Sequence, residues 1–299
     1  MVKGSLGLLL GLLVAYAAST PSGETDPYVA GIEQWREQRE SRLKSDTGWL
    51  TLAGLFWLEP GENSFGTDPS NMIVLPAGTA EAFAGVFRFE DGRVDVRMKP
   101  GVRATVGGEP IEARTLKSDA QSEPDVIALG DRLTMLVIQR GERFGIRLKD
   151  TRSRYREQFA GLAWFPIRES YRIVGRFVPY DPPRSVQVVD VTGNIQSETC
   201  PGKVIFELGG EEVSLEPVQS SDQLFFVFSD ETSGKKTYGS GRFLYADPPE
   251  DGRVVLDFNK AYNPPCAFTP YSTCPLPTKA NRLTVPVEAG ELSYVHSPR

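Results

Sequence analysis

Between residues 49 and 148 the chain alternates short apolar runs with turn-forming residues. Each run has the length of a strand, and Asp91-Gly92 and Gly107-Gly108 stand where tight hairpins would turn. The runs are Trp49 to Leu58, Met72 to Leu75, Val86 to Phe89, Val94 to Met98, Arg103 to Val106, Val126 to Leu129, Leu133 to Gln139 and Phe144 to Leu148. Eight short strands in about 100 residues predict a β-sandwich.

The second half of the chain continues the same pattern after a polar interruption, TRSRYREQ, between Asp150 and Pro166. Its candidate strands are Tyr171 to Val178, Ser185 to Val191, Lys203 to Leu208, Leu224 to Phe228, Thr237 to Tyr245, Arg253 to Phe258 and Arg282 to Val287. The 29 glycines and 23 prolines of the 299 residues also favour turns. We therefore expect a mainly all-β protein of two packed β-sandwich or barrel-like domains, residues 18–155 and 156–299.

One amphipathic helix is expected before the first strand. Asp26 is placed as an N-cap and Pro27 as the first helical residue. Tyr28, Ile32, Trp35 and Leu43 follow at helical spacing, EQWREQRESR forms the charged face, and Gly48 is expected to end the helix.

The first 17 residues predict a signal peptide. Lys3 precedes an apolar run from Leu6 to Val14, and Ala15-Tyr16-Ala17 supplies a small-x-small cleavage pattern. The run is shorter than the roughly 20 residues that span a bilayer. We expect an exported, periplasmic or extracellular protein whose mature chain does not span a membrane; an uncleaved N-terminal membrane helix is the alternative.

Charge is mixed along the chain. The 33 Lys and Arg residues against 39 Asp and Glu residues give a net charge of −6, and no block of basic residues offers a face for nucleic acid. We expect no nucleic-acid partner.

Two resemblances follow from particular stretches. GENSFGTDPSNMIVLP, VRATVGGEP and VIALGDRLTMLVI resemble the strand order of a forkhead-associated domain. In that family a Gly-Arg pair opens the first strand, and a Ser and a His bind phosphothreonine. Here Gly66 is followed by Thr67, and the only histidine is His296. The resemblance therefore implies a fold and no function.

The second resemblance is carried by these residues of the C-terminal half: Asp230, Thr232, Gly234, Thr237-Tyr238, Arg242-Phe243-Leu244, Asp257-Phe258-Asn259, Ala261 to Phe268, Cys274-Pro275-Leu276-Pro277, Asn281-Arg282-Leu283 and Ala289-Gly290-Glu291. They resemble the uncharacterised bacterial and archaeal domain-of-unknown-function family number 1684, and WLTLAGLFWLEPGENSFG, residues 49 to 66, also looks like the opening of that family. The resemblance implies no activity.

Polar residues in this half suggest a ligand site. In RVVLDFN the side chains of Asp257 and Asn259 share one face of a strand, opposite the core face. Such a pair can hold a cation or sugar hydroxyls, or brace the neighbouring turn. Tyr238 and Arg242 on the preceding strand suit a carboxylate, a phosphate or a sugar; the alternative is a buried Arg-Asp pair. With Tyr262 and Asn263 these residues are the candidate ligand-binding set.

The stretch NPPCAFTPYSTCPLP, residues 263 to 277, holds Cys266 and Cys274 among five prolines. An export route favours a disulfide between them, with Cys200 as the odd thiol. Free buried thiols, a nucleophile and a metal ligand are the alternatives; no histidine lies nearby to complete a zinc site, and we expect no metal and no cofactor. We interpret the stretch as a rigid rim over the candidate residues.

Three functions remain open. The first is an exported protein that binds a small polar or carbohydrate-like ligand at the C-terminal β domain. The second is a hydrolase in which Asp257 or Glu291 serves as acid or base, because no usable histidine is present. The third is a structural module of the cell envelope.

Overall fold

The computed structural model describes Met1 and residues 26–295, so the predicted signal peptide lies almost entirely outside the described residues. Helix α1, Pro27–Lys44, begins as expected: the Asp26 carboxylate accepts a hydrogen bond from the Tyr28 amide, and Pro27 opens the helix. The helix ends at Lys44, four residues before Gly48. Among the helices within residues 26–295, none combines the length and the apolar character needed to span a bilayer.

Two sheets from the first half of the chain face each other across one apolar core. Phe65 and Phe87 of one sheet and Ile146 of the other are buried in it. The glycines of both predicted hairpins adopt positive φ, which places Gly92 and Gly107-Gly108 in turns as expected. One sheet has the order β1 (Leu52–Trp57), β11 (Arg143–Asp150), β10 (Leu133–Arg140), β9 (Val126–Leu129), β6 (Ala104–Val106), β7 (Glu109–Pro110); the other β3 (Ile73–Val74), β2 (Gly61–Gly66), β4 (Gly85–Glu90), β5 (Arg93–Met98), β8 (Ala113–Leu116).

The second half of the chain builds two further sheets around a separate core. Val204, Phe226, Leu256 and Phe258 are buried in that core. Every named pairing in these two sheets is antiparallel. The orders are β14 (Glu211–Leu215), β13 (Ile195–Leu208), β12 (Arg172–Val189), β18 (Arg253–Asp257), and β15 (Val218–Ser220), β16 (Gln223–Phe228), β17 (Arg242–Ala246).

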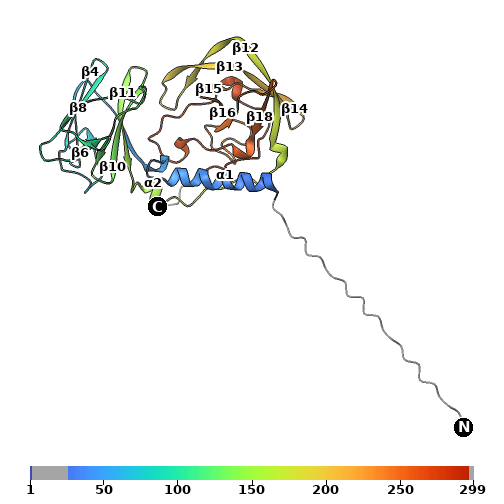
Figure 1. The fold of residues 1–299 in the computed structure, drawn as a ribbon, viewed down its shortest axis with the longest axis horizontal. Helices are drawn as coiled ribbons and strands as arrows, with labels where there is room; N and C mark the ends of the chain where they lie inside the picture. Colours follow the sequence, from blue (N-terminus) through green and yellow to red (C-terminus); the bar gives the residue numbers. More distant parts are fainter. Residues whose placement is uncertain (2–25, 296–299) are drawn as a thin grey trace.

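Helix α1 runs along one side of this second pair of sheets, while the first pair lies beyond its C-terminal end (Figure 1). A linking segment contains the short helix α2, Arg154–Glu157, and the 3-10 turn η2, Glu169–Tyr171. The remaining 3-10 turns are η1 (Trp49–Thr51), η3 (Phe258–Lys260), η4 (Pro265–Ala267) and η5 (Lys279–Asn281). The all-β fold class with an N-terminal helix is confirmed; the sheets are sandwich-like, and none within residues 26–295 closes into a barrel. The boundary at residue 155 stays a prediction.

Two strand predictions in the second half were wrong. Residues 282–287 form no strand, because Pro286 has no N–H to donate and only Arg282 makes a backbone bridge, with Ser229. The strand expected from Thr237 begins only at Arg242, since Gly241 adopts a φ of 94° that turns the chain.

Candidate functional site

The proline-rich segment, residues 263–277, lies between strand β17 and the end of β12. Tyr262 pairs with Phe243 by a backbone bridge, the Leu276 amide donates to the Val189 carbonyl at 2.8 Å, and the Val191 amide donates to the Cys274 carbonyl at 3.0 Å. These bonds hold the segment at both ends. It forms a rim beside strand β17.

The predicted disulfide is absent, because Cys266, Cys274 and Cys200 are all free thiols. Cys266 and Cys274 are nevertheless neighbours: the Cys266 amide donates to the Cys274 sulfur at 3.2 Å. The hydroxyl of Ser272 donates to the Cys266 sulfur at 3.0 Å. The two sulfurs are therefore held by hydrogen bonds instead of a covalent bond.

Arg242 is a buried brace and not an exposed ligand-binding group. Its guanidinium is 1% exposed and donates to Asp230 at 2.9 Å, to the Val287 carbonyl at 2.9 Å, and to the Ala289 carbonyl. Burial lowers the pKa of Arg242, and the charge of Asp230 opposes that shift. The sequence analysis gave a buried Arg-Asp pair as the alternative role of Arg242, and this alternative matches the geometry, with Asp230 as the partner.

A second buried ion pair ties helix α1 to the rim. Arg39 donates to Glu291 at 3.0 Å and to the Asn263 carbonyl at 2.9 Å. The Asn263 amide donates to Glu291 at 2.8 Å, and its side chain donates to the Leu292 carbonyl at 2.7 Å. Asn263 and Glu291 are both fully buried. Their polar groups fix the rim to the helix.

The prediction that Asp257 and Asn259 share a strand face opposite the core was wrong, because strand β18 ends at Asp257 and Asn259 lies fully buried in turn η3. The two side chains are nevertheless in contact. The Tyr28 hydroxyl donates to Asp257 Oδ1 at 2.9 Å, and the amide and side chain of Asn259 each donate to the same oxygen at 3.2 Å. The Asn259 side chain also donates to the Arg168 carbonyl at 2.8 Å. Burial, with the charge of Asp257, raises the pKa of Tyr28. Asn259 is a brace, whereas Asp257 sits at the edge of an open groove.

This groove runs between helix α1 and strands β16 to β18 and has a volume of about 960 Å³. Of the six candidate ligand-binding residues only Asp257 and Tyr262 line it. Tyr238 packs instead against the cluster around Phe268. The rest of the lining comes from residues that the sequence did not indicate as ligand-binding candidates. Among them are Trp35, Arg42, Trp49, Arg172, Gln223, Phe225, Phe243, Tyr245, Asp247, Val255 and Lys260.

One wall of the groove is a row of aromatic rings. The rings of Phe225 and Tyr245 are stacked with centroids 4.7 Å apart, and those of Tyr245 and Tyr262 are stacked at 6.5 Å with an interplanar angle of 15°. Trp35 of helix α1 lies 6.4 Å from Tyr262. Tyr245 is exposed. It therefore presents part of its aromatic surface to whatever enters the groove.

The groove carries more positive than negative charge. Arg42, Arg172 and Lys260, which we call the groove cations, form no ion pair with any residue in the described ranges. The acidic lining residues are Asp247 and Asp257. A cationic groove on a chain of net charge −6 is a local feature, because the overall charge has the opposite sign.

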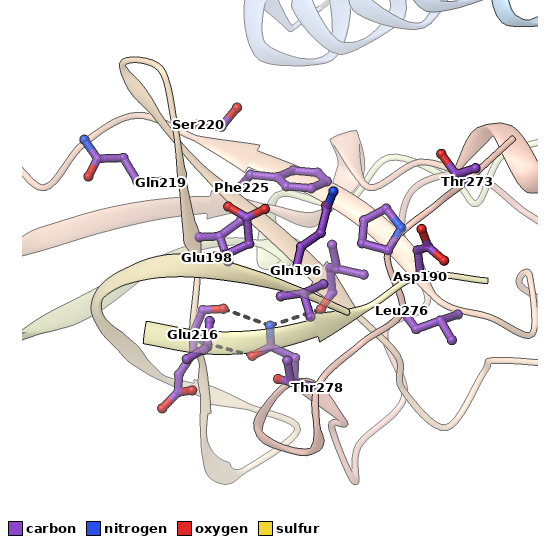
Figure 2. A pocket seen from close by; sticks show the side chains of 16 residues that line it. Asp190, Gln196, Glu198, Glu216, Gln219, Ser220, Phe225, Thr273, Leu276 and Thr278 are labelled. Atoms are coloured by element: carbon purple, nitrogen blue, oxygen red, sulfur yellow. Dashed lines mark hydrogen bonds between the residues drawn. The ribbon is translucent and has the colours of Figure 1, made fainter. Parts of the chain in front are cut away.

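A second cavity, of about 210 Å³, shares the lining residue Phe225 with the groove; Figure 2 shows this cavity. Its charged lining residues are Asp190, Glu198 and Glu216, and none of the described Lys and Arg residues lines it. Glu216 accepts a hydrogen bond from the Tyr180 hydroxyl at 2.6 Å. Thr273, Pro275 and Leu276 of the rim line this acidic cavity, and Pro265 of the rim lines the cationic groove. The rim thus contributes residues to both.

The comparisons with known proteins agree with the predicted family resemblance. Residues 157–292 match the protein family described as "Protein of unknown function (DUF1684)". An uncharacterised protein from gene locus rrnAC0354 of Haloarcula marismortui, whose structure was solved by NMR in solution, is 31% identical in sequence to this chain. The alignment covers 46% of this chain and 78% of that chain, with a TM-score of 0.39. The likeness of residues 49 to 66 to the family stays a prediction. No curated protein matches.

Two solved forkhead-associated domains are similar to part of the chain at 17% identity and a TM-score of 0.23. One is the FHA domain of FhaA in complex with the intracellular domain of Rv3910, and covers 32% of this chain and 97% of that chain. The other comes from a study of phosphothreonine-dependent FHA domain interactions, and covers 32% and 92%.

Proposed function

Because the chain belongs to the DUF1684 family, whose description assigns no activity, we propose from its geometry that it binds a small anionic, carbohydrate-like ligand in the groove between α1 and strands β16 to β18. The observation that carries the proposal is the row of stacked rings beside the three groove cations, which have no ion-pair partner in the part of the chain that the structure describes. Aromatic faces pack against the apolar faces of sugar rings, and guanidinium and ammonium groups bind carboxylates and phosphates.

Size and hydrogen bonding support the same class of ligand. A volume of about 960 Å³ accommodates a mono- or disaccharide. Among residues 26–295, the hydrogen bonds that the Asp257 carboxylate accepts all end on Oδ1. Its Oδ2 atom is therefore available to accept a ligand hydroxyl.

A thermal-shift screen tests the proposal. We expect D-glucuronate or glucose 6-phosphate to raise the Tm, by an amount equivalent to about 2.7 kcal/mol at 100 times Kd, and D-glucose at the same concentration to raise it much less. Lys260→Met should weaken binding of the anionic sugar about tenfold or more, because a charge-assisted hydrogen bond contributes roughly 1.5–3 kcal/mol.

The matched control is Lys99→Met, which removes an exposed lysine of the N-terminal half that lies 3.9 Å from Glu81. This variant should bind as the wild type does. If both lysine variants lower affinity equally, the attraction is a general effect of charge and the groove is not the site.

The hydrolase alternative depends on Asp257 and Glu291. Glu291 is fully buried beneath Arg39 and does not line the groove, so its carboxylate would need a rearrangement to reach a ligand. We therefore favour binding over hydrolysis. After prolonged incubation, we expect NMR of the supernatant to show the sugar unchanged. Release of a cleaved product from an aryl glucuronide would instead favour the hydrolase.

Export is also part of the proposal, supported by Lys3, the run Leu6 to Val14 and the small-x-small pattern at residues 15–17. We expect the mature protein to begin at residue 18, as read by N-terminal sequencing of material from outside the cytoplasm. Leu10→Arg should keep the full-length chain in the cytoplasm, because a charge in the apolar run prevents insertion. A wild-type chain that retains Met1 and stays in the cytoplasm would contradict export.

A further inference from the structure

The two cysteines of the rim differ in their surroundings. Cys266 keeps part of its surface exposed, whereas Cys274 is 5% exposed and packs with Val227 and Phe243. Prolines on both sides of each cysteine restrict the backbone of the segment. One thiol is therefore open to a reagent, and its neighbour is shielded by the protein.

Hydrogen bonds bring the two sulfurs into one small network. Cys274 Sγ accepts from the Cys266 amide at 3.2 Å and donates to Ser272 Oγ at 3.6 Å. Ser272 Oγ donates in turn to Cys266 Sγ at 3.0 Å. The Ser272 hydroxyl, which donates to Cys266 Sγ, favours the thiolate form of Cys266, and the thiol form donates to the Ser272 carbonyl at 3.6 Å.

These hydrogen bonds outweigh the effects that oppose ionisation of Cys266. Hydrogen bonding from Cys274, with that from Ser272, lowers the pKa of Cys266 to about 7 against the opposing effects of burial and Asp190. The same coupling raises the pKa of Cys274, and burial adds to that shift. Arg147 of strand β11 is close enough that a thiolate at either cysteine raises the pKa of its guanidinium. A negative sulfur at Cys266 thus lies near a positive group.

We propose that Cys266 and Cys274 form a redox-active dithiol that reacts with small-molecule disulfides, with Cys266 as the attacking thiol and Cys274 as the resolving thiol. This inference is independent of the ligand proposed for the groove. It rests on the adjacency of the two sulfurs, on the unequal access to them, and on the hydrogen bonds that end on each.

The reaction has two steps. The Cys266 thiolate attacks one sulfur of the disulfide RSSR, that S–S bond breaks, and the products are a Cys266–SR mixed disulfide and one RS⁻. Cys274 then gives its proton to the departing thiolate or to water and attacks Cys266 Sγ, releasing the second RS⁻. The protein dithiol loses two electrons and two protons, and RSSR is reduced to two thiols.

The location of the dithiol gives the reaction a structural consequence. Pro265, directly before Cys266, lines the groove, and Thr273 and Pro275, on either side of Cys274, line the acidic cavity. A bond between the two sulfurs would link the part of the rim that lines the groove covalently to the part that lines the acidic cavity.

The test uses the reduced full chain and oxidised glutathione, followed by mass spectrometry of peptides. The wild type should form the Cys266–Cys274 disulfide and release two equivalents of reduced glutathione. Cys274→Ser should accumulate glutathione at Cys266, because the resolving thiol is absent. Cys266→Ser should remain unmodified at Cys274.

Cys200 is the internal control, since it is fully buried, donates to the Gly202 carbonyl at 3.2 Å and has a pKa raised by burial. Alkylation of the native wild type by iodoacetamide gives a second measurement that needs no variant. Cys266 should be labelled at least about tenfold faster than Cys200 and Cys274, and its rate should rise with pH around a midpoint near 7. Faster labelling of Cys274 or Cys200, a glutathione adduct in Cys266→Ser, or a Cys266 that reacts no faster than Cys200 would each overturn the proposal.

Discussion

Asp230→Ala is expected to lower the free energy of unfolding by about 3–5 kcal/mol, the range for removing one partner of a buried ion pair. The guanidinium of Arg242 is 1% exposed, and Asp230 is its only carboxylate partner among the described residues. Asp230 Oδ1 also accepts from the Thr232 hydroxyl at 2.7 Å and from the Val287 amide at 3.1 Å. The variant therefore leaves a buried cation and several donors without an acceptor.

Denaturant unfolding of two further variants separates the contributions. Asp230→Asn keeps an oxygen for Thr232 and Val287 but loses the charge, so its loss of stability should be intermediate. Glu62→Ala breaks an exposed pair with Arg97 at 3.0 Å and should change the free energy of unfolding by less than about 1 kcal/mol. Equal losses for Asp230→Ala and Glu62→Ala would show that the buried pair is not the brace described above.

Gly290→Ala is the other change expected to have a large effect, with a loss of about 2–5 kcal/mol. Gly290 adopts a φ of 81°, and a Cβ atom there would lie 2.3 Å from the Ala261 carbonyl oxygen. The left-handed backbone conformation accounts for about 1–2 kcal/mol, and the clash with backbone adds an overpacking cost of about 1–3 kcal/mol. Because Gly290 precedes Glu291, the variant also strains the pair with Arg39.

Gly108→Ala provides a matched control for Gly290→Ala. Gly108 has a φ of 85°, yet a Cβ atom there would meet nothing within 4 Å. Its loss of stability should therefore be limited to the backbone contribution, about 1–2 kcal/mol. If both alanine variants shift the midpoint of denaturant unfolding by the same amount from the wild type, the close approach between Gly290 and Ala261 contributes nothing to stability.

Local patterns in the sequence predicted most of the architecture. The N-cap at Asp26 was correct because it depends only on neighbouring residues. The face of RVVLDFN opposite Asp257 was correctly assigned to the core, where Val254 and Leu256 are buried, because that assignment too depends only on alternation along a strand. The disulfide prediction was wrong: spacing and export favour a bond, but the structure shows both sulfurs as hydrogen-bonded thiols.

The groove could not be predicted, because it joins residues that are remote in the sequence. Arg42 belongs to the helix face assigned to solvent, and that face turns toward strands more than 170 residues later. Arg172 reaches the groove only because it pairs with Asp257 across strands β12 and β18. Arg242, by contrast, was selected for its charge, and its burial depends on contacts with the chain near residue 289. Long-range packing decides which arginine is a ligand group and which is a brace.

The central claim is that the groove cations and the stacked rings bind an anionic sugar. Isothermal titration calorimetry with D-glucuronate, and with D-glucose as the uncharged reference, tests this claim most directly. We expect the wild type to bind glucuronate at least about tenfold more tightly than glucose. Lys260→Met should remove most of that preference, and Tyr245→Ala should weaken the binding of both sugars by removing the exposed ring of the stack. Equal affinities for the two sugars, or a preference for glucuronate that survives Lys260→Met, would contradict the account.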